Sequence, residues 1–285
     1  MKKCFLCNKK TSFYKKFNRI IINQCIGCKL AFTNNHPKTK NLYKNTVYNL
    51  DQYLSLKRLQ ENKFLNISNK INQVISQGDI LEVGAGFGLF SSILSKNNKY
   101  HIEVIEPNLP LHFIQENYKV TKHKKTYEEF LKSNKKKYDC VILLDVLEHF
   151  YNPGLIFKQT KNILKNKGFI VIQFPNYKSL MASLCKDWSW WMVEDHKFHF
   201  SPNSSKLLLN KEGYNIIYLR TYASLYDFKK NLDGNFSKIK NSTLRKAIKI
   251  IYLSLFFPLY ILLRKFLWYL GYGGLIFIIA QKKSN

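Results

Sequence analysis

The sequence predicts an α/β fold, a doubly wound and mostly parallel sheet, preceded by a small cysteine-rich module. Two observations predict the sheet. From residue 78 onward, short apolar runs suited to buried strands alternate with stretches of helical periodicity, and one such run leads directly into three closely spaced glycines. The module is predicted by two pairs of cysteines near the start of the chain.

The 285-residue chain is long enough for one ordinary domain and an appendage, and its net charge is +28. Only five of the 46 lysines and arginines are arginine. Because arginine forks dominate phosphate and base recognition, we interpret the lysine excess as a compositional bias and not as a nucleic-acid surface. Met1 to Lys3 lead into a cysteine pair with no apolar stretch behind it, so we expect no signal peptide and a reducing, cytoplasmic location.

The first cysteine-rich segment has the spacing C-x2-C-x17-C-x2-C, which is typical of a four-cysteine zinc site. Its members are Cys4, Cys7, Cys25 and Cys28. We predict a zinc ribbon over residues 1–33, in which bound zinc supplies the free energy that so small a core lacks. Two disulfides in a secreted module are the alternative, but no secretory signal accompanies them.

Residues 34–77 are expected to form a linker and a helical lid. Turns are predicted around Pro37, and the apolar residues between 51 and 75 recur with helical spacing. Tyr43, Tyr48 and Tyr53 are candidates to cover a ligand pocket of the next domain, with an ordinary core or surface role as the alternative.

The stretch over residues 80–108 has the order of a strand, a tight glycine turn and a helix, followed by a second strand. The glycines are Gly84, Gly86 and Gly88. Such glycines let a backbone approach a ligand closely, and the second strand ends in Glu106, near the separation of about 20 residues at which a carboxylate binds ribose hydroxyls. Leu89 stands where a dinucleotide fingerprint needs its third glycine, so we predict a pocket for a different nucleotide-type ligand.

The other strands and helices follow in alternation. Residues 126–129 have the form of a capping box, and residues 138–144 form a continuous apolar strand that ends at Asp145. Asn152-Pro153 has the pattern of a helix start, and a strand is predicted over 169–174. Weaker patterns predict helices over 109–117 and 202–210, and strands over 118–121 and 214–221.

Several of these motifs together resemble those of class I S-adenosylmethionine-dependent methyltransferases. They are E-V-G-A-G-F-G at 82–88, Glu106, D-V-L-E-H at 145–149 and F-P-N at 174–176. The resemblance covers roughly residues 78–220 and implies a Rossmann-like methyltransferase domain over 78–285, with a seven-stranded sheet whose last strand, at 275–281, is antiparallel. It also implies S-adenosylmethionine as cofactor, bound by Glu82, Gly84, Ala85, Gly86, Gly88, Glu106, Pro107, Asp145, Val146 and Leu147.

The segment over residues 187–201 resembles the D-H-x-x-H-F-S segment of these methyltransferases, which lines the acceptor side of their pocket. A neutral histidine can take a proton from an acceptor hydroxyl as the methyl group arrives, so His196, His199 and His149 are the catalytic candidates. Alternatively, His196 and His199 only hold this loop against the sheet, and His149 faces solvent at a helix start. A metal site that adds Glu194 and Asp195 to the two histidines is a weaker alternative.

An apolar helical insertion is predicted at about residues 230–272. Its most apolar run, residues 250–263, is too short to span a bilayer and contains Pro258, so we expect a helix packed on the sheet and around the acceptor site. The second hypothesis is peripheral membrane contact through residues 245–270, at the inner face of the membrane, because cations flank the run and attract anionic lipid. These cations are Arg245, Lys246, Lys249, Arg264 and Lys265.

The patterns predict an enzyme that transfers a methyl group from S-adenosylmethionine to a small-molecule or glycan-type acceptor. The zinc-ribbon methyltransferases that the chain resembles are associated with cell-surface polysaccharide biosynthesis, although the carboxyl-terminal domain of the sugar C-methyltransferases among them is not found here. One alternative is an RNA methyltransferase that uses the basic surface and the ribbon, but F-P-N-Y at 174–177 lacks the second proline of a base-methylation motif. The other is a noncatalytic zinc-ribbon interaction protein.

Overall fold

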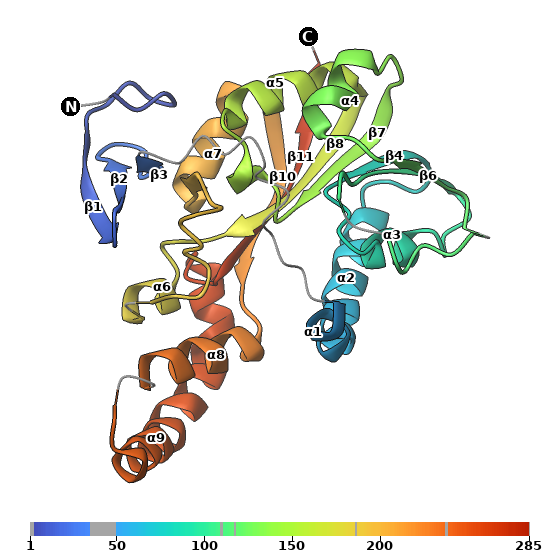
Figure 1. Ribbon diagram of the computed structural model, residues 1–285. Coiled ribbons are helices and arrows are strands. Elements are labelled where there is room, and N and C mark those ends of the chain that lie inside the picture. Colours follow the sequence, from blue (N-terminus) through green and yellow to red (C-terminus); the bar gives the residue numbers. More distant parts are fainter. Residues whose placement is uncertain are drawn as a thin grey trace.

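The computed structural model describes residues 3–34, 50–108, 111–116, 118–185, 187–236 and 239–284. A seven-stranded sheet forms its centre, in the order β10-β11-β8-β7-β4-β5-β6 (Figure 1). The strands are β4 (Gly78–Val83), β5 (Tyr100–Ile105), β6 (Val120–His123), β7 (Tyr138–Leu144), β8 (Leu164–Pro175), β10 (Tyr214–Tyr222) and β11 (Leu275–Lys282). This confirms the predicted sheet, although β6 begins two residues later than the strand expected at 118.

The strand directions place several carboxyl ends at one edge of the sheet. The neighbours from β8 to β6 pair in parallel, whereas β11 is antiparallel to both β8 and β10. The antiparallel last strand is therefore confirmed, and β10 runs in the same direction as the parallel strands. In such a sheet, ligands bind outside the carboxyl ends of the strands. Val83, Ile105, Leu144 and Tyr222 end their strands at this edge.

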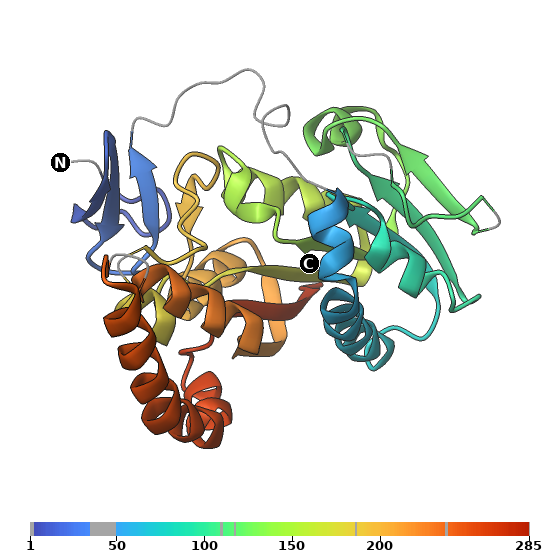
Figure 2. The same cartoon turned by 60° about the horizontal axis from the view of Figure 1, so that its bottom comes forward.

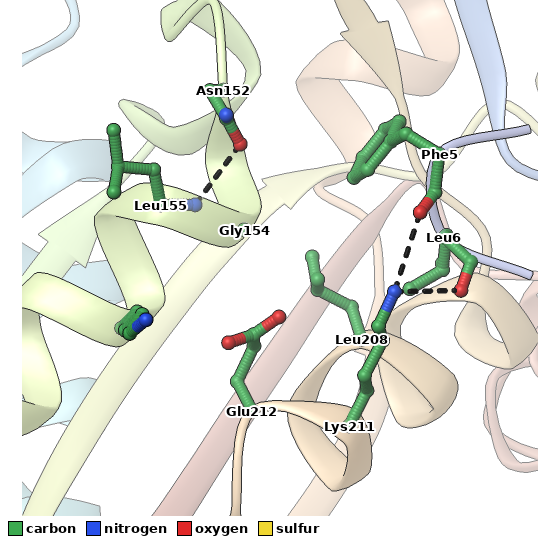
Figure 3. Close-up of a pocket in the computed structure, with 9 residues that line it drawn as sticks. Phe5, Leu6, Asn152, Gly154, Leu155, Leu208, Lys211 and Glu212 are labelled. Carbon is green, nitrogen blue, oxygen red and sulfur yellow. Dashed lines mark hydrogen bonds between the residues drawn. The ribbon is translucent and has the colours of Figure 1, made fainter.

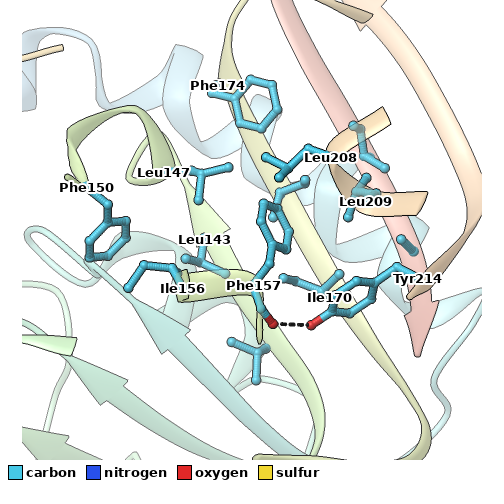
Figure 4. Packing of buried hydrophobic residues seen from close by; sticks show 14 of the residues in the cluster. Leu143, Leu147, Phe150, Ile156, Phe157, Ile170, Phe174, Leu208, Leu209 and Tyr214 are labelled. Atoms are coloured by element: carbon cyan, nitrogen blue, oxygen red, sulfur yellow. Dashed lines mark hydrogen bonds between the residues drawn. The ribbon is translucent and has the colours of Figure 1, made fainter. Parts of the chain in front are cut away.

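Helices cover both faces of the sheet and give two separate apolar clusters. Residues of α2 (Lys57–Asn72) and α3 (Leu89–Leu94) pack on one face, next to the short α1 (Leu50–Ser55). Residues of α4 (Tyr127–Ser133), α5 (Pro153–Ile163) and α7 (Pro202–Lys211) pack on the other face. Figure 4 shows this second cluster, where the Tyr214 hydroxyl donates to the Phe157 carbonyl oxygen at 3.0 Å. A sheet covered on both faces explains why its central strands are continuously apolar.

The predicted helix starts are confirmed by their side-chain caps. Thr126 and Glu129 form a reciprocal capping box, with the Glu129 amide donating to the Thr126 hydroxyl at 3.2 Å. The Asn152 side chain accepts from the Leu155 amide at 3.0 Å, ahead of Pro153 at the first helical position. Each cap satisfies an amide that the helix itself leaves without a partner.

The amino-terminal module shares a sheet with the rest of the chain. Its strands are β1 (Thr11–Phe17), β2 (Ile20–Cys25) and β3 (Ala31–Asn34), and the two-residue β9 (Phe198–His199) completes a four-stranded antiparallel sheet. Figure 2 shows β1 to β3, in blue, beside the yellow segment that contains β9. The module is therefore joined through β9 to the segment predicted to line the acceptor side.

One predicted helix does not form. Residues 111–116, the described part of the helix expected at 109–117, make turns instead, and Leu111 has a positive φ of 51°. The Phe113 amide donates to the Phe87 carbonyl oxygen at 2.9 Å, and Ile114 lies against Gly88. Contact with the glycine turn thus replaces helical hydrogen bonds in this segment. A short 3₁₀ turn, Leu147–His149, and the helix α6 (Leu180–Leu184) were not predicted.

The insertion differs most from the prediction. It consists of α8 (Leu225–Phe236) and α9 (Ser242–Tyr269), which lie beyond the edge of the sheet (Figure 1). The expectation of a helix packed on the sheet is wrong for most of α9, because only 6% of its most apolar 18-residue window is buried. The statement that the segment is too short to span a bilayer is also wrong, since α9 continues through Pro258 and reaches 28 residues. Its length and composition would suffice to cross a membrane.

Candidate functional site

The glycine turn after β4 follows a backbone path that other residues would strain. Gly84, Gly86 and Gly88 have φ values of 71°, 58° and 80°. A Cβ atom at Gly84 would lie 2.6 Å from a methyl group of Val146, and one at Gly88 would lie 2.5 Å from Ile114. Both the positive φ and the close neighbours require glycine. The turn therefore lets the side chains of Val146 and Ile114 approach its backbone closely, at the edge of the sheet where ligands bind.

Glu106 lies directly across from this turn. The Gly86 amide donates to Glu106 Oε2 at 2.9 Å, and the Asn108 amide donates to Oε1 at 3.0 Å. The parallel pairing of β4 with β5 brings the two strand ends together, and Pro107 follows immediately. The carboxylate is buried yet anchored by two backbone amides, so it holds one orientation beside the glycine turn.

Glu82 points to the inside of the domain. Its carboxylate accepts a short hydrogen bond from the Ser91 hydroxyl of α3, and burial raises the pKa of Glu82 to about 8. The side chain is therefore protonated at neutral pH. Ala85, within the turn itself, is buried as well.

Asp145 occupies the end of β7 in the left-handed region, with φ of 58°. Its Oδ2 accepts from Gln173 Nε2 at 2.7 Å and from Lys63 Nζ of α2 at 3.2 Å, and the Tyr222 hydroxyl donates to the Gln173 side chain. Its Oδ1 is buried and has no hydrogen-bond partner among the described residues. A buried carboxylate oxygen without a partner requires a hydrogen-bond donor. Asp145 Oδ1 can therefore accept from a cationic or hydrogen-bonding ligand.

The two residues after Asp145 differ in their surroundings. Val146 lies against Gly84, at the glycine turn, whereas Leu147 is buried in the apolar cluster on the α5 side of the sheet (Figure 4). Of this predicted pair, Val146 is thus the one that borders the turn.

The sequence reasoning missed the partners of Asp145. Lys63, Gln173 and Tyr222 come from three elements that lie far apart in the chain, and no local pattern connects them. The sequence contains one sign of these partners, because Gln173 is the polar residue of the apolar run F-I-V-I-Q-F. In the structure Gln173 is fully buried. A polar side chain in a buried strand requires a partner. Tyr53 of the predicted lid does meet the glycine turn, at 5.1 Å between ring centroids from Phe87, while Tyr43 and Tyr48 lie outside the described residues.

His149 and His196 lie together beside Glu148. Their ring centroids are 4.8 Å apart, and His196 Nδ1 is 3.1 Å from the Trp190 carbonyl oxygen. Burial lowers the pKa of His196 well below its usual range and raises the pKa of Glu148 well above its own. Although Glu148 Oε1 is 3.9 Å from His196 Nε2, we therefore regard the two as neutral neighbours and not as an ion pair. His149 is the only one of these three side chains that is not fully buried.

His199 takes a structural position. It is buried in β9, its Nε2 is 3.3 Å from the Thr33 hydroxyl of β3, and burial lowers its pKa to about 3. This geometry favours the alternative in which the histidine holds the loop. The predicted metal set of Glu194, Asp195, His196 and His199 does not gather among the described residues. Of these four, only His196 belongs to a group of close ligand atoms, which it forms with Glu148 and His149 within 4.8 Å of one another.

The four amino-terminal cysteines converge. Their sulfur atoms all lie within 4.8 Å of one another, with 3.7 Å between Cys4 and Cys28 and 3.3 Å between Cys7 and Cys25. Four ligands around one zinc ion at about 2.3 Å would be separated by about 3.8 Å in a tetrahedron. The cluster is close to this geometry.

A separate groove of about 260 Å³ lies between the first cysteine knuckle and helices α5 and α7 (Figure 3). Phe5 and Leu6 form one wall, Leu155 and Leu208 lie in it, and Lys211 Nζ donates to the Leu6 carbonyl oxygen at 3.2 Å. None of its lining residues belongs to the sites described above.

Comparisons with known proteins agree with this fold. A family model described as "Methyltransferase domain" matches residues 53–219. Among solved structures, a plantazolicin methyltransferase in complex with SAH is similar with a TM-score of 0.55 and 16% identity, over 86% of this chain and 93% of that one. A SAM-dependent methyltransferase from Archaeoglobus fulgidus is similar with a TM-score of 0.50 and 20% identity, over 79% and 99%. At such identities these structures support the fold alone.

Curated relatives match over a shorter region. The chain is 29% identical over 119 residues to a ubiquinone biosynthesis O-methyltransferase of Hydrogenovibrio crunogenus, which is 39% of this chain and 49% of that protein. It is 34% identical over 107 residues to the protein of the same name in Rickettsia bellii, which is 36% of this chain and 44% of that protein. The chain thus spans about half the length of the curated relatives that it matches.

Proposed function

The chain belongs to the methyltransferase-domain family, and from this premise we propose that it transfers the methyl group of S-adenosylmethionine to an oxygen of a small-molecule acceptor. The observation that carries the proposal is the contact of Glu106 with the Gly86 amide at the carboxyl edge of the sheet. This contact supports the proposal, because a fixed carboxylate and a close-approach glycine turn lie beside each other, as the binding of an adenosine requires.

The residues present fit this cofactor. Glu106 would hold the ribose hydroxyls, and the turn from Gly84 to Gly88 would accommodate the nucleoside against its backbone. Asp145 Oδ1, which has no partner among the described residues, would accept from the ammonium group of the methionine part. Bound S-adenosylmethionine supplies a methyl group on a cationic sulfur. Lys63 and Gln173 fix the Asp145 carboxylate by holding its other oxygen, so the free lone pairs point in one direction.

His149 is the base of the proposed transfer. It is the partly exposed member of the histidine pair, so an acceptor can reach it, while His196 behind it is buried and neutral. His149 takes the proton of the acceptor hydroxyl as the oxygen attacks. A positioned base of this kind contributes about 10²- to 10⁴-fold to a rate. His196 positions the ring of His149 by edge-to-face contact.

The choice of an oxygen acceptor rests on the relatives, which are named as O-methyltransferases of ubiquinone biosynthesis. The glycan acceptor and the role in polysaccharide biosynthesis stay predictions. Against the RNA alternative, the Asn176 amide already donates to the Gly271 and Gly273 carbonyl oxygens, at 2.8 Å each. It therefore has no free donors for a target base.

The second part of the proposal is a structural zinc ion bound by the four amino-terminal cysteines. The sulfur separations support it. The buried residues of the module also join clusters of the rest of the chain and form no core of their own, so an ion that crosslinks the module would stabilise it. Because four cysteines close the coordination shell, the ion holds the module together and takes no part in methyl transfer.

Transfer of a labelled methyl group to phenolic small molecules tests the proposal. We expect labelled product with the native chain and about 10²- to 10⁴-fold slower turnover for His149→Ala, with cofactor affinity unchanged. His101→Ala, on an exposed strand position away from the site, is the matched control. Equal turnover of the His149 and His101 variants would show that His149 is not the base.

A further inference from the structure

Helix α9 exposes an apolar stripe that nothing in the described chain covers. Ile251, Leu255, Leu259, Leu262 and Phe266 recur at three- and four-residue spacing, and their exposed fractions lie between 52% and 78%. Further exposed apolar side chains adjoin them, namely Ile250, Phe256, Leu263, Tyr269 and Leu270. A continuous apolar surface of this kind marks an interaction site on a folded protein.

The opposite side of α9 is held by the protein. Tyr260 is buried and stacks on Phe228 of α8 with ring centroids 4.3 Å apart, and Phe257 packs on the same ring. Near the carboxyl end of α9, the Thr221 hydroxyl of β10 donates to the Trp268 carbonyl oxygen at 2.6 Å. The helix therefore has one face fixed on the domain and the other facing outward.

The packing of one face of α9 on the domain distinguishes between two possibilities, a helix that lies in a membrane surface and a helix that spans a membrane. A spanning helix would expose its packed side to lipid, and it would have to leave α8, which carries the charged residues Asp227 and Lys230. A helix that lies in the interface buries only its outward face. The packing of α9 matches the second arrangement, even though its length would allow the first.

The charges of α9 indicate that the helix binds an anionic surface. The helix carries five cations and no acidic residue, with Arg245, Lys246 and Lys249 in its first turns and Arg264 and Lys265 near its end. All five lie outside the apolar stripe. Such flanking cations attract anionic lipid headgroups, whereas a second copy of α9 would bring like charges together.

We propose that α9 lies in the plane of an anionic membrane surface, with its apolar stripe in the lipid, and holds the active site there. Strand β10 leads from the carboxyl edge of the sheet into α8, and its last residue, Tyr222, belongs to the hydrogen-bonded group around Asp145. The membrane contact is therefore attached to the side where the cofactor binds. Resting on the proposed function, this implies an acceptor dissolved in the bilayer, with a methylated head group and an apolar tail.

Flotation of the full chain with vesicles tests the membrane contact without any methyl transfer. The native chain should float with vesicles of phosphatidylcholine and phosphatidylglycerol and less with phosphatidylcholine alone. The combined variant Leu255→Gln, Leu259→Gln, Leu262→Gln should bind ~100-fold more weakly, because three leucines no longer enter the lipid. The matched control carries Leu54→Gln, Leu59→Gln and Leu65→Gln, which replace exposed leucines of α1 and α2.

Several outcomes would overturn the proposal. Native chain that stays with the soluble fraction, or equal binding by the α9 variant and the control, would mean that the stripe does not enter lipid. Sedimentation that shows a dimer lost only in the α9 variant would assign the stripe to a second copy of the chain. An unchanged melting temperature of the α9 variant confirms that the loss is local. Because the vesicle assay contains no cofactor, its result is independent of whether methyl transfer is observed.

Discussion

Removal of zinc should loosen the acceptor-side loop as well as the ribbon, because β9 belongs to the ribbon sheet. The Thr33 amide donates to the Lys197 carbonyl oxygen at 2.9 Å, and the Thr33 hydroxyl donates to the His196 carbonyl oxygen at 3.0 Å. Gln24 Nε2 donates to the Tyr177 hydroxyl at 2.8 Å, and the Tyr177 amide donates to the Phe200 carbonyl oxygen of the loop at 3.2 Å. At about 1 kcal/mol each, loss of the three bonds donated by Thr33 and Gln24 lowers the local stability by about 3 kcal/mol. That corresponds to ~100-fold less protection of the loop amides.

Hydrogen exchange on the full chain, with and without a chelator, measures this effect. Peptides from residues 3–34 and 196–200 should lose protection together, whereas β4 and β7 should keep theirs. Cys7→Ser should behave like the chelated protein, and Cys185→Ala, at a cysteine outside the cluster, should not. If residues 3–34 lose protection while residues 196–200 keep theirs, the loop does not depend on the ribbon. If the chelator changes the protection of neither segment, the prediction of a bound metal is wrong.

Two further predictions concern carboxylates at the carboxyl edge. The folded-state pKa of Glu82 lies above its unfolded value, so its contribution to stability falls as pH rises from about 4.5 through about 8, by up to ~1.4 kcal/mol per pH unit. Thermal melts across this pH range should show that Glu82→Gln weakens the decline in stability. Glu61→Gln, at an exposed carboxylate, should leave the decline unchanged. Identical pH profiles for the native chain and Glu82→Gln would contradict the raised pKa of Glu82. Asp145→Asn should weaken cofactor binding about 10-fold or more in calorimetry, because the ammonium loses a charged acceptor, and unchanged affinity would place the methionine part elsewhere.

The sheet could be predicted because each of its elements has a local signature. Continuous apolar runs between caps and glycines specify buried parallel strands, and the reciprocal cap at Thr126 is contained within four residues. The approach of Gly86 to Glu106 followed as well, since two parallel strand ends must meet at one edge. These features depend on neighbours in sequence or on strand direction alone.

The parts that were missed depend on tertiary contacts. Helical spacing in the insertion predicted a helix, but it could not tell which side of α9 would be covered, because only the folded chain places Phe228 against Tyr260. The two-residue β9 is too short for any periodicity, and its pairing with β3 brings together residues that are far apart in sequence. The turns at 111–116 replaced a predicted helix because the contact of Ile114 with Gly88 outweighs a weak local preference.

Calorimetric titration of the native chain and of Glu106→Ala with S-adenosylmethionine tests directly whether Glu106 and the glycine turn bind this cofactor. We expect one binding site per chain and ~10- to 100-fold weaker binding by the variant, since a charged hydrogen bond of about 1.5 to 3 kcal/mol to the ribose is lost. Glu116→Ala, at an exposed carboxylate, should bind as the native chain does. Absence of binding by the native chain, or equal affinity of the Glu106 and Glu116 variants, would contradict it.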